Sequence, residues 1–384
     1  MRNRLRKKVI FVFGTRPEAI KMGPLFHELS ARSERFEVSA CVTGQHREML
    51  DQTLAAFEIE PEFDLNVMRP NQDLFDVTSA VLLGMRDVIA DARPDLMLVH
   101  GDTTTTFAAS VAGFYANIPV AHVEAGLRTH DLAAPFPEEF NRQVASKLAT
   151  WHFAPTSQSE ENLLAEGVGP ERILVTGNTV IDALFWVLGR IDESGRRRGA
   201  IEELLDSQLP FDWRRTRFVL ITGHRRENFG EGFEQICRAL ETLAGRFADV
   251  HFVYPVHLNP NVQAPVRRIL GELDNVHLIP PLDYEPFVYL LRACDLVLTD
   301  SGGIQEEGPS LGKPVLVMRD VTERPEAIAA GTVRLVGANY AEIVGNVAEL
   351  LEDRTAHAAM SRAHNPYGDG MACRRIADFL EGLP

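Results

Sequence analysis

The stretch KVIFVFGTRPEAIK, residues 8–21, decides the fold class of this chain. Its first part, Lys8–Phe13, is continuously apolar after the lysine, which is typical of a strand buried on both faces of a parallel sheet. Gly14 allows a tight turn after this run, and Pro17 suits the first position of a helix. The stretch therefore predicts a strand that leads through a short turn into a helix, the first half of a βαβ unit.

The same order of strand, turn and helix recurs along the chain. Apolar runs that end in turns are followed by segments with helical periodicity, which predicts parallel strands with helices between them. The further strands predicted in this way are residues 36–42, 95–100, 118–123, 151–154, 218–222, 250–254, 276–279, 295–299, 314–318 and 333–336. Residues 190–215 are charged and irregular, so we expect them to lie between two domains.

We therefore expect an α/β protein with two doubly wound, Rossmann-like domains facing a central cleft. The first domain would cover residues 1–178, with a C-terminal helix within residues 366–384 packing back on it. The second would cover residues 179–365. Because ligands of doubly wound sheets bind beyond the carboxyl ends of the strands, the residues that end the strands are the candidate site.

The composition argues against several classes of protein. The 384 residues include 39 Lys and Arg against 54 Asp and Glu, a net charge of −15, which argues against nucleic-acid binding. No apolar run has the roughly 18–20 residues of a membrane-spanning helix, and the apolar run after the basic start is too short for a secretory signal. Cys41, Cys237, Cys294 and Cys373 form no CxxC pair. We expect a cytoplasmic protein without a disulfide framework, metal or membrane association.

Three carboxylates follow strands of the first domain or begin its next helix. Asp102 and Glu124 come directly after apolar runs, and Glu138 begins a helix that also contains Arg142. Carboxylates crowded at one sheet edge would have separated pKa values, which suits general acid and base catalysis. The simpler alternatives are that Asp102 only caps a helix and that Glu138 and Arg142 form a surface pair.

Several groups suited to anions also follow strands. Arg16 and Lys21 lie at the start of the first predicted helix, where a helix N-terminus favours anions. In the second domain, the turn after residues 218–222 contains a histidine and two arginines. The turn after residues 295–299 is glycine-rich, so its backbone N–H groups can approach a pyrophosphate. The candidates in this domain are His224, Ser301, Gly302, Gly303, Glu307 and Arg324. Because GxGxxG and GxxxxGK[ST] are both absent, we expect no nicotinamide cofactor and no P-loop.

Together these motifs resemble a known family, the non-hydrolysing UDP-N-acetylglucosamine 2-epimerases of bacteria. The resemblance extends over nearly the whole chain, with the motifs in the same order. They include FGTRPEAIKM (13–22), VHGDTTTT (99–106), HVEAGLRT (122–129), FPEEFNR (136–142), TGHRREN (222–228), TDSGGIQEE (299–307) and GKPVLVMRDVTERPEA (312–327).

The resemblance implies a fold of the GT-B type and a reversible inversion at C2 that interconverts UDP-N-acetylglucosamine and UDP-N-acetylmannosamine. In this family UDP is eliminated to give 2-acetamidoglucal and then adds back, without a cofactor. The product would supply N-acetylmannosamine units for surface polysaccharides, and the enzyme would be a homodimer.

The resemblance also implies roles for single residues. Asp102, Glu124 and Glu138 would perform the acid and base steps, with His224 near the leaving diphosphate. Further residues would bind the substrate: Arg16, Lys21, Arg142, Phe287, Ser301, Gly302, Gly303, Glu307 and Arg324. Leu282 replaces a glutamine of some relatives, so an amide contact to uracil is not expected here. Gln45, His46, Arg225 and His257 lie in motifs associated with an activating second substrate site.

Three alternatives stay open on the sequence alone. A retaining glycosyltransferase of the same fold would share the glycine-rich nucleotide site but would not need the carboxylates. A hydrolysing epimerase would release UDP and free N-acetylmannosamine. A non-catalytic sensor would bind the UDP-sugar in the same pocket without converting it.

Overall fold

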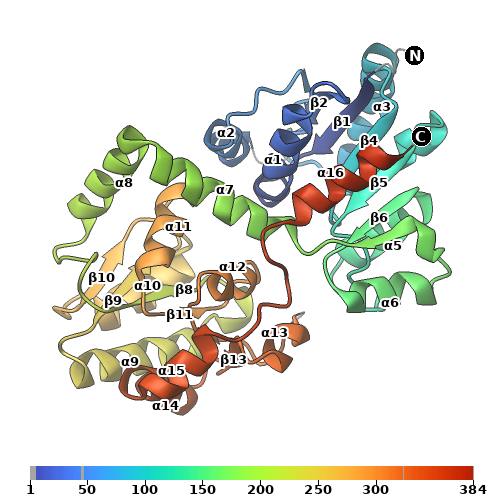
Figure 1. The fold of residues 1–384 in the computed structure, drawn as a ribbon. Coiled ribbons are helices and arrows are strands. Elements are labelled where there is room, and N and C mark those ends of the chain that lie inside the picture. Colours follow the sequence, from blue (N-terminus) through green and yellow to red (C-terminus); the bar gives the residue numbers. More distant parts are fainter. Residues whose placement is uncertain (1–5, 45–46, 323, 384) are drawn as a thin grey trace. The chain divides into compact units, whose positions relative to one another are not determined.

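The structure is a computed structural model that describes residues 6–44, 47–322 and 324–383. The chain divides into two compact units, drawn in Figure 1. Unit 1 comprises Met1–Trp186 and Tyr367–Pro384, and unit 2 comprises Val187–Pro366. The division falls inside helix α7 (Thr179–Glu193). The domain boundary expected after residue 178 stays a prediction.

The described part of unit 1 contains a parallel seven-stranded sheet in the order β3-β2-β1-β4-β5-β6-β7. Its strands are β1 (Lys7–Phe13), β2 (Phe36–Val42), β3 (Phe63–Asp64), β4 (Leu96–His100), β5 (Val120–Val123), β6 (Trp151–Ala154) and β7 (Ile173–Val175). The chain first builds outward from β1 to β3 and then returns to add β4 on the other side of β1. The topological switch point of this sheet therefore lies between β1 and β4.

Helices cover both faces of the first sheet. They are α1 (Arg16–Ala31), α2 (Arg47–Ala56), α3 (Leu74–Ala92), α4 (Thr104–Tyr115), α5 (Glu138–Leu148), α6 (Ser157–Ala165), the start of α7 and α16 (Ala372–Gly382), with a 3₁₀ turn at Pro170–Arg172. Residues of α3 and α4 pack with Ile10 and Val12 of β1. Phe11 points to the opposite face, where it contacts Phe26 of α1. On unit 1, α16 lies against α1 (Figure 1).

Unit 2 repeats this architecture with a parallel sheet of six strands among its described residues, in the order β10-β9-β8-β11-β12-β13. The strands are β8 (Phe218–Thr222), β9 (His251–Pro255), β10 (Val276–Ile279), β11 (Leu296–Thr299), β12 (Val315–Val317) and β13 (Val333–Leu335). The switch point lies between β8 and β11. The predicted fold class, two doubly wound α/β domains, is therefore confirmed.

One face of the second sheet holds a continuous core. Val219 and Ile221 of β8 pack there with Phe233 and Leu240 of the helix α9 (Glu231–Arg246) and with Val347 of the helix α14 (Tyr340–Glu352), all of them buried. The helices of this unit after α7 are α8 (Gly195–Gln208), α9 (Glu231–Arg246), α10 (Pro260–Leu270), α11 (Tyr284–Ala293), α12 (Ile304–Ser310), α13 (Pro325–Ala329), α14 (Tyr340–Glu352) and α15 (Arg354–Ser361), with a 3₁₀ turn at Arg226–Asn228.

Two details differ from the sequence-based expectations. Residues 190–215 are not irregular, because the end of α7 and all of α8 occupy most of this stretch. Arg, Glu and Leu are good helix formers, and the Ser194 side chain caps α8 by accepting from the Arg197 backbone N–H. The short strands β3 and β7 were not predicted, since two or three residues carry too little pattern.

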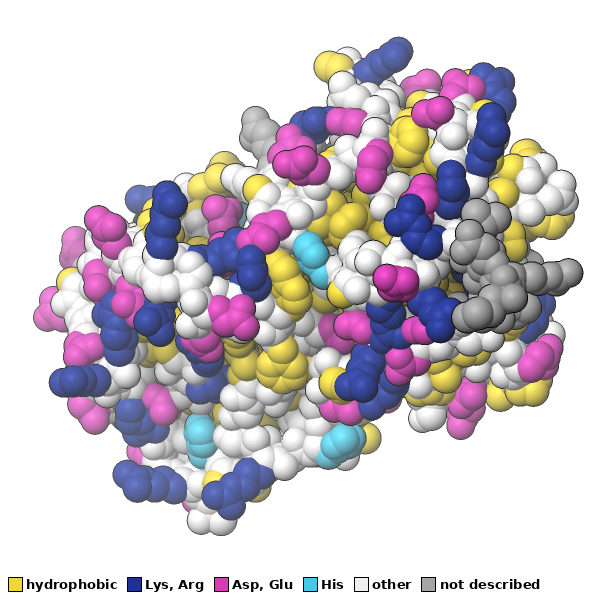
Figure 2. All heavy atoms as spheres, turned by 45° about the horizontal axis from the view of Figure 1, so that its top comes forward, with side chains coloured by type: hydrophobic (Ala, Val, Ile, Leu, Met, Phe, Trp, Pro, Cys, Tyr) yellow, Lys and Arg dark blue, Asp and Glu magenta, His cyan; other side chains and the backbone are white. Residues whose placement is uncertain are grey.

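The surface is mixed in charge. On the face drawn in Figure 2, basic and acidic side chains are interspersed. Within the described residues, no helix is both long and apolar enough to cross a membrane.

Candidate active site

A cavity of about 480 Å³ opens at the switch point of unit 1, where the loops after β1 and β4 meet. Its lining includes four of the predicted site residues, two cations and two carboxylates. The lining residues are Thr15, Arg16, Pro17, Glu18, Lys21, Met49, His100, Gly101, Asp102, Thr103 and Glu124. The structure thus brings together Arg16, Lys21, Asp102 and Glu124, which are far apart in sequence.

Buried Glu18 ties the two loops together. One carboxylate oxygen accepts from the backbone N–H groups of Gly14 (2.9 Å) and Thr15 (2.8 Å) and thereby caps α1. The other oxygen accepts at 2.6 Å from the hydroxyl of Thr103, a residue in the loop after β4. Gly14 is required here, because a Cβ at this position would lie 2.0 Å from the Thr43 hydroxyl oxygen. These contacts fix the floor of the cavity.

Glu124 is held at the end of β5 in an unusual backbone conformation. Its φ of 60° lies in the left-handed region, which costs a residue with a side chain about 1–2 kcal/mol. Its carboxylate pairs with the Lys21 ammonium and lies 3.3 Å from Nε2 of buried His100. Burial alone would raise the pKa of Glu124, but Lys21 and His100 hold this pKa well below its usual range. The carboxylate is therefore ionised, the form that accepts a proton.

Asp102 lines the same cavity and is anchored from α5. Its carboxylate pairs with Arg142. Asn141 donates to its backbone carbonyl oxygen at 2.9 Å. Buried Glu139 lies 3.3 Å from the same guanidinium, and its oxygens accept from backbone N–H groups in the preceding loop. Asp102 is not the helix cap of the simpler alternative, because Thr103 caps α4 and Arg142 of α5 pairs with the Asp102 carboxylate.

Glu138 is not among the lining residues of this cavity, although it begins α5 and is partly exposed. The surface pair that spacing offered as an alternative, Glu138 with Arg142, is not what the structure shows. Arg142 pairs with Asp102 and Glu139 instead. The proposed acid–base role of Glu138 stays a prediction.

In unit 2 the candidate residues again flank the switch point of the sheet. His224 follows β8, and Asp300 follows the adjacent strand β11. The His224 ring stacks on His257 with a centroid distance of 5.4 Å and an interplanar angle of 21°. Partial burial lowers the pKa of His224, and the nearby Asp300 carboxylate opposes this effect.

The glycine-rich turn after β11 lies against a guanidinium. A Cβ on Gly302 would lie 2.7 Å from Nη1 of Arg324, so this turn and Arg324 touch. Arg324 is held in place by buried Glu306, whose carboxylate accepts from Nε at 2.6 Å. Ser301 donates its backbone N–H to Thr299 at 2.9 Å, and Gly303 precedes α12. The turn therefore combines open backbone with a fixed positive charge, the requirements of a diphosphate site.

Two further candidates lie on helices α11 and α12. Buried Glu307, in the first turn of α12, accepts from the Tyr284 hydroxyl at 2.7 Å. Phe287 is partly buried in α11, the helix that Tyr284 begins, and Leu282 precedes it. The structure thus connects α11 with α12 through Glu307, as a nucleoside site built from these residues would require.

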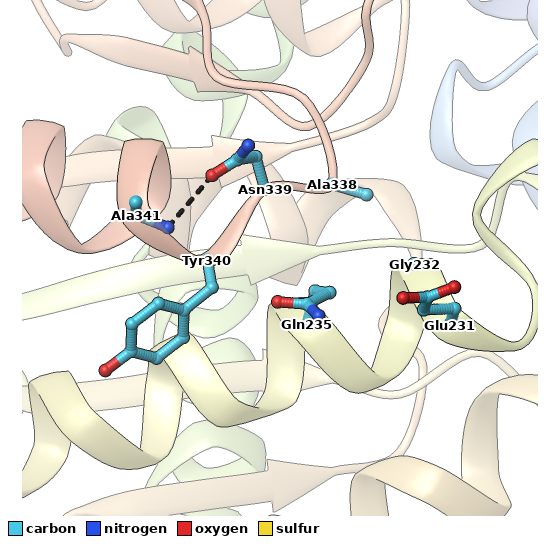
Figure 3. Close-up of a pocket in the computed structure, with 7 residues that line it drawn as sticks. All are labelled: Glu231, Gly232, Gln235, Ala338, Asn339, Tyr340 and Ala341. Carbon is cyan, nitrogen blue, oxygen red and sulfur yellow. Dashed lines mark hydrogen bonds between the residues drawn. The ribbon is translucent and has the colours of Figure 1, made fainter.

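Part of the predicted activating site cannot be placed. Gln45 and His46 lie outside the described residues, whereas Arg225 and His257 adjoin His224 in unit 2. A second cavity of about 560 Å³ lies in the same unit between the starts of α9 and α14 (Figure 3). None of the predicted site residues lines it. Its lining residues are Glu231, Gly232, Gln235, Ala338, Asn339, Tyr340 and Ala341.

Three residues that support the candidate sites are not among the residues predicted from the sequence. Glu18, His100 and Asp300 each contact a predicted site residue or its loop. His100 and Asp300 each come at the end of a strand, within motifs that were already recognised. Their position was therefore a usable signal, but their burial and the direction of their side chains were not visible in the sequence.

Comparisons with known proteins agree with this arrangement. A family model described as UDP-N-acetylglucosamine 2-epimerase matches residues 27–381. The UDP-N-acetylglucosamine 2-epimerases of Salmonella typhimurium and of Escherichia coli K12 are each 58% identical over 374 residues, which cover 97% of this chain and 98% of each relative. A crystal structure of UDP-GlcNAc 2-epimerase from Neisseria meningitidis, bound to UDP-GlcNAc, is 50% identical with a TM-score of 0.87. That match covers 97% of this chain and 99% of the other. This chain therefore belongs to the UDP-N-acetylglucosamine 2-epimerase family.

Proposed function

We propose that this chain interconverts UDP-N-acetylglucosamine and UDP-N-acetylmannosamine without net hydrolysis. The observation that carries the proposal is the pair of anchored carboxylates, Asp102 and Glu124, in one cavity at the switch point of unit 1. Membership of the family supports the substrate, and the Neisseria meningitidis relative was crystallised with UDP-GlcNAc.

The chemistry requires a base and an acid rather than a redox cofactor. The C2 proton is not adjacent to a carbonyl and is weakly acidic. A carboxylate takes this proton while the C1–O bond breaks and its electron pair leaves with UDP, which forms the C1=C2 double bond of 2-acetamidoglucal. UDP then adds back to C1, and a carboxylic acid returns a proton to the other face of C2. Positioned acid–base groups typically contribute about 10²–10⁴-fold to such steps.

The described contacts suit Glu124 to the accepting step, because Lys21 and His100 keep its carboxylate ionised. Asp102, fixed by Arg142, and Glu138 are the candidates for the second carboxylate. In unit 2 we assign the diphosphate to the turn at Ser301, Gly302 and Gly303 with Arg324 and His224. We assign the ribose to Glu307 and the uracil to Phe287.

The test is incubation of the full chain with UDP-N-acetylglucosamine in D₂O, followed by NMR. We expect a UDP-linked product with inverted C2 and deuterium at C2, and no accumulation of free sugar. Release of UDP and free N-acetylmannosamine would favour a hydrolysing epimerase. Absence of deuterium at C2 would contradict epimerisation and leave the glycosyltransferase or the sensor.

We retain substrate activation as a second part of the proposal, through Arg225 and His257 together with Gln45 and His46. The stacking of His257 on His224 supports it, because a ligand that binds at one ring would change the surroundings of the other. Initial rates should depend sigmoidally on UDP-N-acetylglucosamine, and the reverse reaction should require a trace of it. Hyperbolic kinetics in both directions would contradict activation.

We also propose a homodimer, a cytoplasmic location and supply of N-acetylmannosamine units to surface polysaccharides. Apolar side chains of α3 and α4 support the dimer, because Phe75, Leu83, Phe114 and Tyr115 are each more than half exposed. Pairing of two copies would cover such apolar surface. Sedimentation equilibrium should give twice the chain mass, and a monomer at micromolar concentration would contradict the dimer.

A further inference from the structure

Asp300 joins the two strands that flank the switch point of unit 2. It directly follows β11, and its side chain is completely buried. Its Oδ2 accepts from the backbone N–H groups of His224 and Arg225, each at 2.8 Å, in the turn after β8. The carboxylate thereby fixes the backbone at His224.

The second oxygen of this carboxylate faces the imidazole ring. Oδ1 of Asp300 makes no hydrogen bond with any described residue and lies 3.4 Å from Nδ1 of His224. A buried carboxylate oxygen without a donor costs stability, and the ring nitrogen is the titratable group that it faces. A small rotation of the imidazole would turn this approach into a hydrogen bond donated by Nδ1.

The surroundings leave the far side of the ring available. His257 stacks on the face of His224, and its own Nδ1 accepts from the backbone N–H of Asn259 at 3.1 Å. The His224 side chain is 46% exposed, so the ring is accessible to a ligand. Across the switch point, the Ser301 turn follows Asp300 directly in the chain.

We infer that Asp300 is a positioning residue for His224: it accepts a hydrogen bond from the Nδ1–H group and directs Nε2 toward the ligand. This inference rests on the proposed function for its consequence. When His224 is protonated, Asp300 would stabilise the imidazolium, and Nε2–H would donate to the diphosphate on which negative charge develops as UDP leaves. In this role Asp300 acts through His224 and does not touch the substrate.

The Asp300→Asn variant tests this inference. The two backbone N–H groups need an acceptor, so the introduced amide must place its oxygen where Oδ2 was. Its NH₂ group then faces Nδ1 of His224 and can only donate. The neutral ring should therefore change from the Nδ1–H to the Nε2–H tautomer, with no loss of side-chain volume.

The measurement is ¹⁵N NMR of the full chain with labelled histidine, with the His224 signals identified by their loss in His224→Asn. We expect Nδ1–H in the wild type, Nε2–H in Asp300→Asn, and a lower His224 pKa in the variant. Turnover should fall by at least about 10-fold, as when a transition-state donor is weakened. Asp300→Asn should add nothing further to His224→Asn.

A matched control lies at the other end of the same strand. Asp295 precedes β11, and its carboxylate accepts from the Phe218 backbone N–H at 3.1 Å. Asp295→Asn should leave the His224 tautomer and the turnover unchanged.

An unchanged tautomer in Asp300→Asn would overturn the inference. The inference would also be overturned if the double variant lost turnover by the product of the losses in Asp300→Asn and His224→Asn. The tautomer is read without turnover, so it tests Asp300 even if the chain proves not to be an epimerase. Conversely, normal C2 exchange by the wild type together with an unchanged tautomer in Asp300→Asn would support the proposed function and reject only the positioning role of Asp300.

Discussion

At the scale of single residues, Glu124 shows how the fold maintains an ionised carboxylate in a cavity. Its left-handed backbone costs about 1–2 kcal/mol, and partial burial of the carboxylate adds to that cost. Lys21 compensates the buried charge, and removing one partner of such a pair commonly costs about 3–5 kcal/mol because the other charge is left uncompensated. A strained residue that the surrounding structure holds in place is typical of functional sites.

Replacing Lys21 by Met should therefore shift the pH dependence of the reaction. In the wild type the depressed pKa keeps Glu124 ionised well below its usual titration range. Without Lys21, burial would raise this pKa, so Glu124 would be protonated at a higher pH. The acid limb of the kcat profile should move up by at least about one pH unit, measured by initial rates from pH 4.5 to 8.

The same change should alter stability in a defined direction. A carboxylate with a depressed folded-state pKa stabilises the protein above its unfolded-state pKa, and this contribution is lost as the pH falls through the folded-state value. Lys21→Met should remove the contribution at neutral pH. Lys147→Met, at an exposed position of α5, is the control. If the acid limb and the neutral stability of Lys21→Met match those of the control, the role given to Lys21 is wrong.

Several single residues could be predicted because parallel strands end at one edge of a sheet. Asp102 and Glu124 follow apolar runs, and the structure places both in one cavity. The contacts of His100 and Asp300 could not be predicted, because they depend on which strands are adjacent and on side-chain direction. Glu138 begins a helix as expected, but its position relative to the cavity depends on the loop before α5.

At the scale of elements, α16 depends on a carboxylate from α7. The backbone N–H groups of Ala372 and Cys373 donate to buried Asp182 at 3.1 and 2.8 Å, and the residue before α16, Met371, provides no side-chain cap. The cap therefore joins two helices that are almost two hundred residues apart in the sequence.

Asp182→Ala should lower the free energy of unfolding by about 1–3 kcal/mol, because it leaves buried N–H groups without acceptors. Urea denaturation followed by circular dichroism measures this change. Asp192→Ala on the same helix is the matched control. Asp192 is half exposed and pairs with Arg292, so its removal should cost less than about 1 kcal/mol. Equal costs for the two variants would contradict the capping role.

The glycine-rich turn of unit 2 gives a second prediction at this scale. In Gly302→Ala the new methyl group would displace the Arg324 guanidinium, which lies within contact distance. UDP affinity should fall by about 10-fold, equivalent to about 1.4 kcal/mol, as measured by calorimetry. Gly245→Ala in α9, where a Cβ meets no atom within 4 Å, should bind UDP like the wild type. If Gly302→Ala bound UDP as tightly as the wild type, the assignment of this turn to the diphosphate site would be wrong.

The elements themselves were predictable to different degrees. Long apolar runs such as Phe36–Val42 gave the strands, because burial on both faces leaves a strong pattern. The stretch containing α8 was misjudged because its charges show no amphipathic stripe, although its residues favour a helix. β3 and β7 are too short for any periodicity to appear.

At the scale of the whole molecule, the two units share one arrangement of sheet and candidate residues. Each sheet has a switch point next to its first strand, and candidate residues of each unit follow the strands at that point, Asp102 in unit 1 and His224 in unit 2. Unit 1 presents carboxylates balanced by Lys21 and Arg142, and unit 2 presents an open glycine turn with Arg324. The net charge of −15 is compatible with an anionic ligand because the positive groups are local.

The most direct test of the central claim is deuterium incorporation at C2 of the UDP-sugar in D₂O by wild type, Glu124→Gln and Asp102→Asn, with UDP affinity measured in parallel. The claim is that the unit 1 carboxylates perform the proton transfers. We expect rapid incorporation by the wild type and a loss of about 10²–10⁴-fold in each variant, with UDP affinity changed by less than about threefold. Incorporation at the wild-type rate by both variants would contradict it.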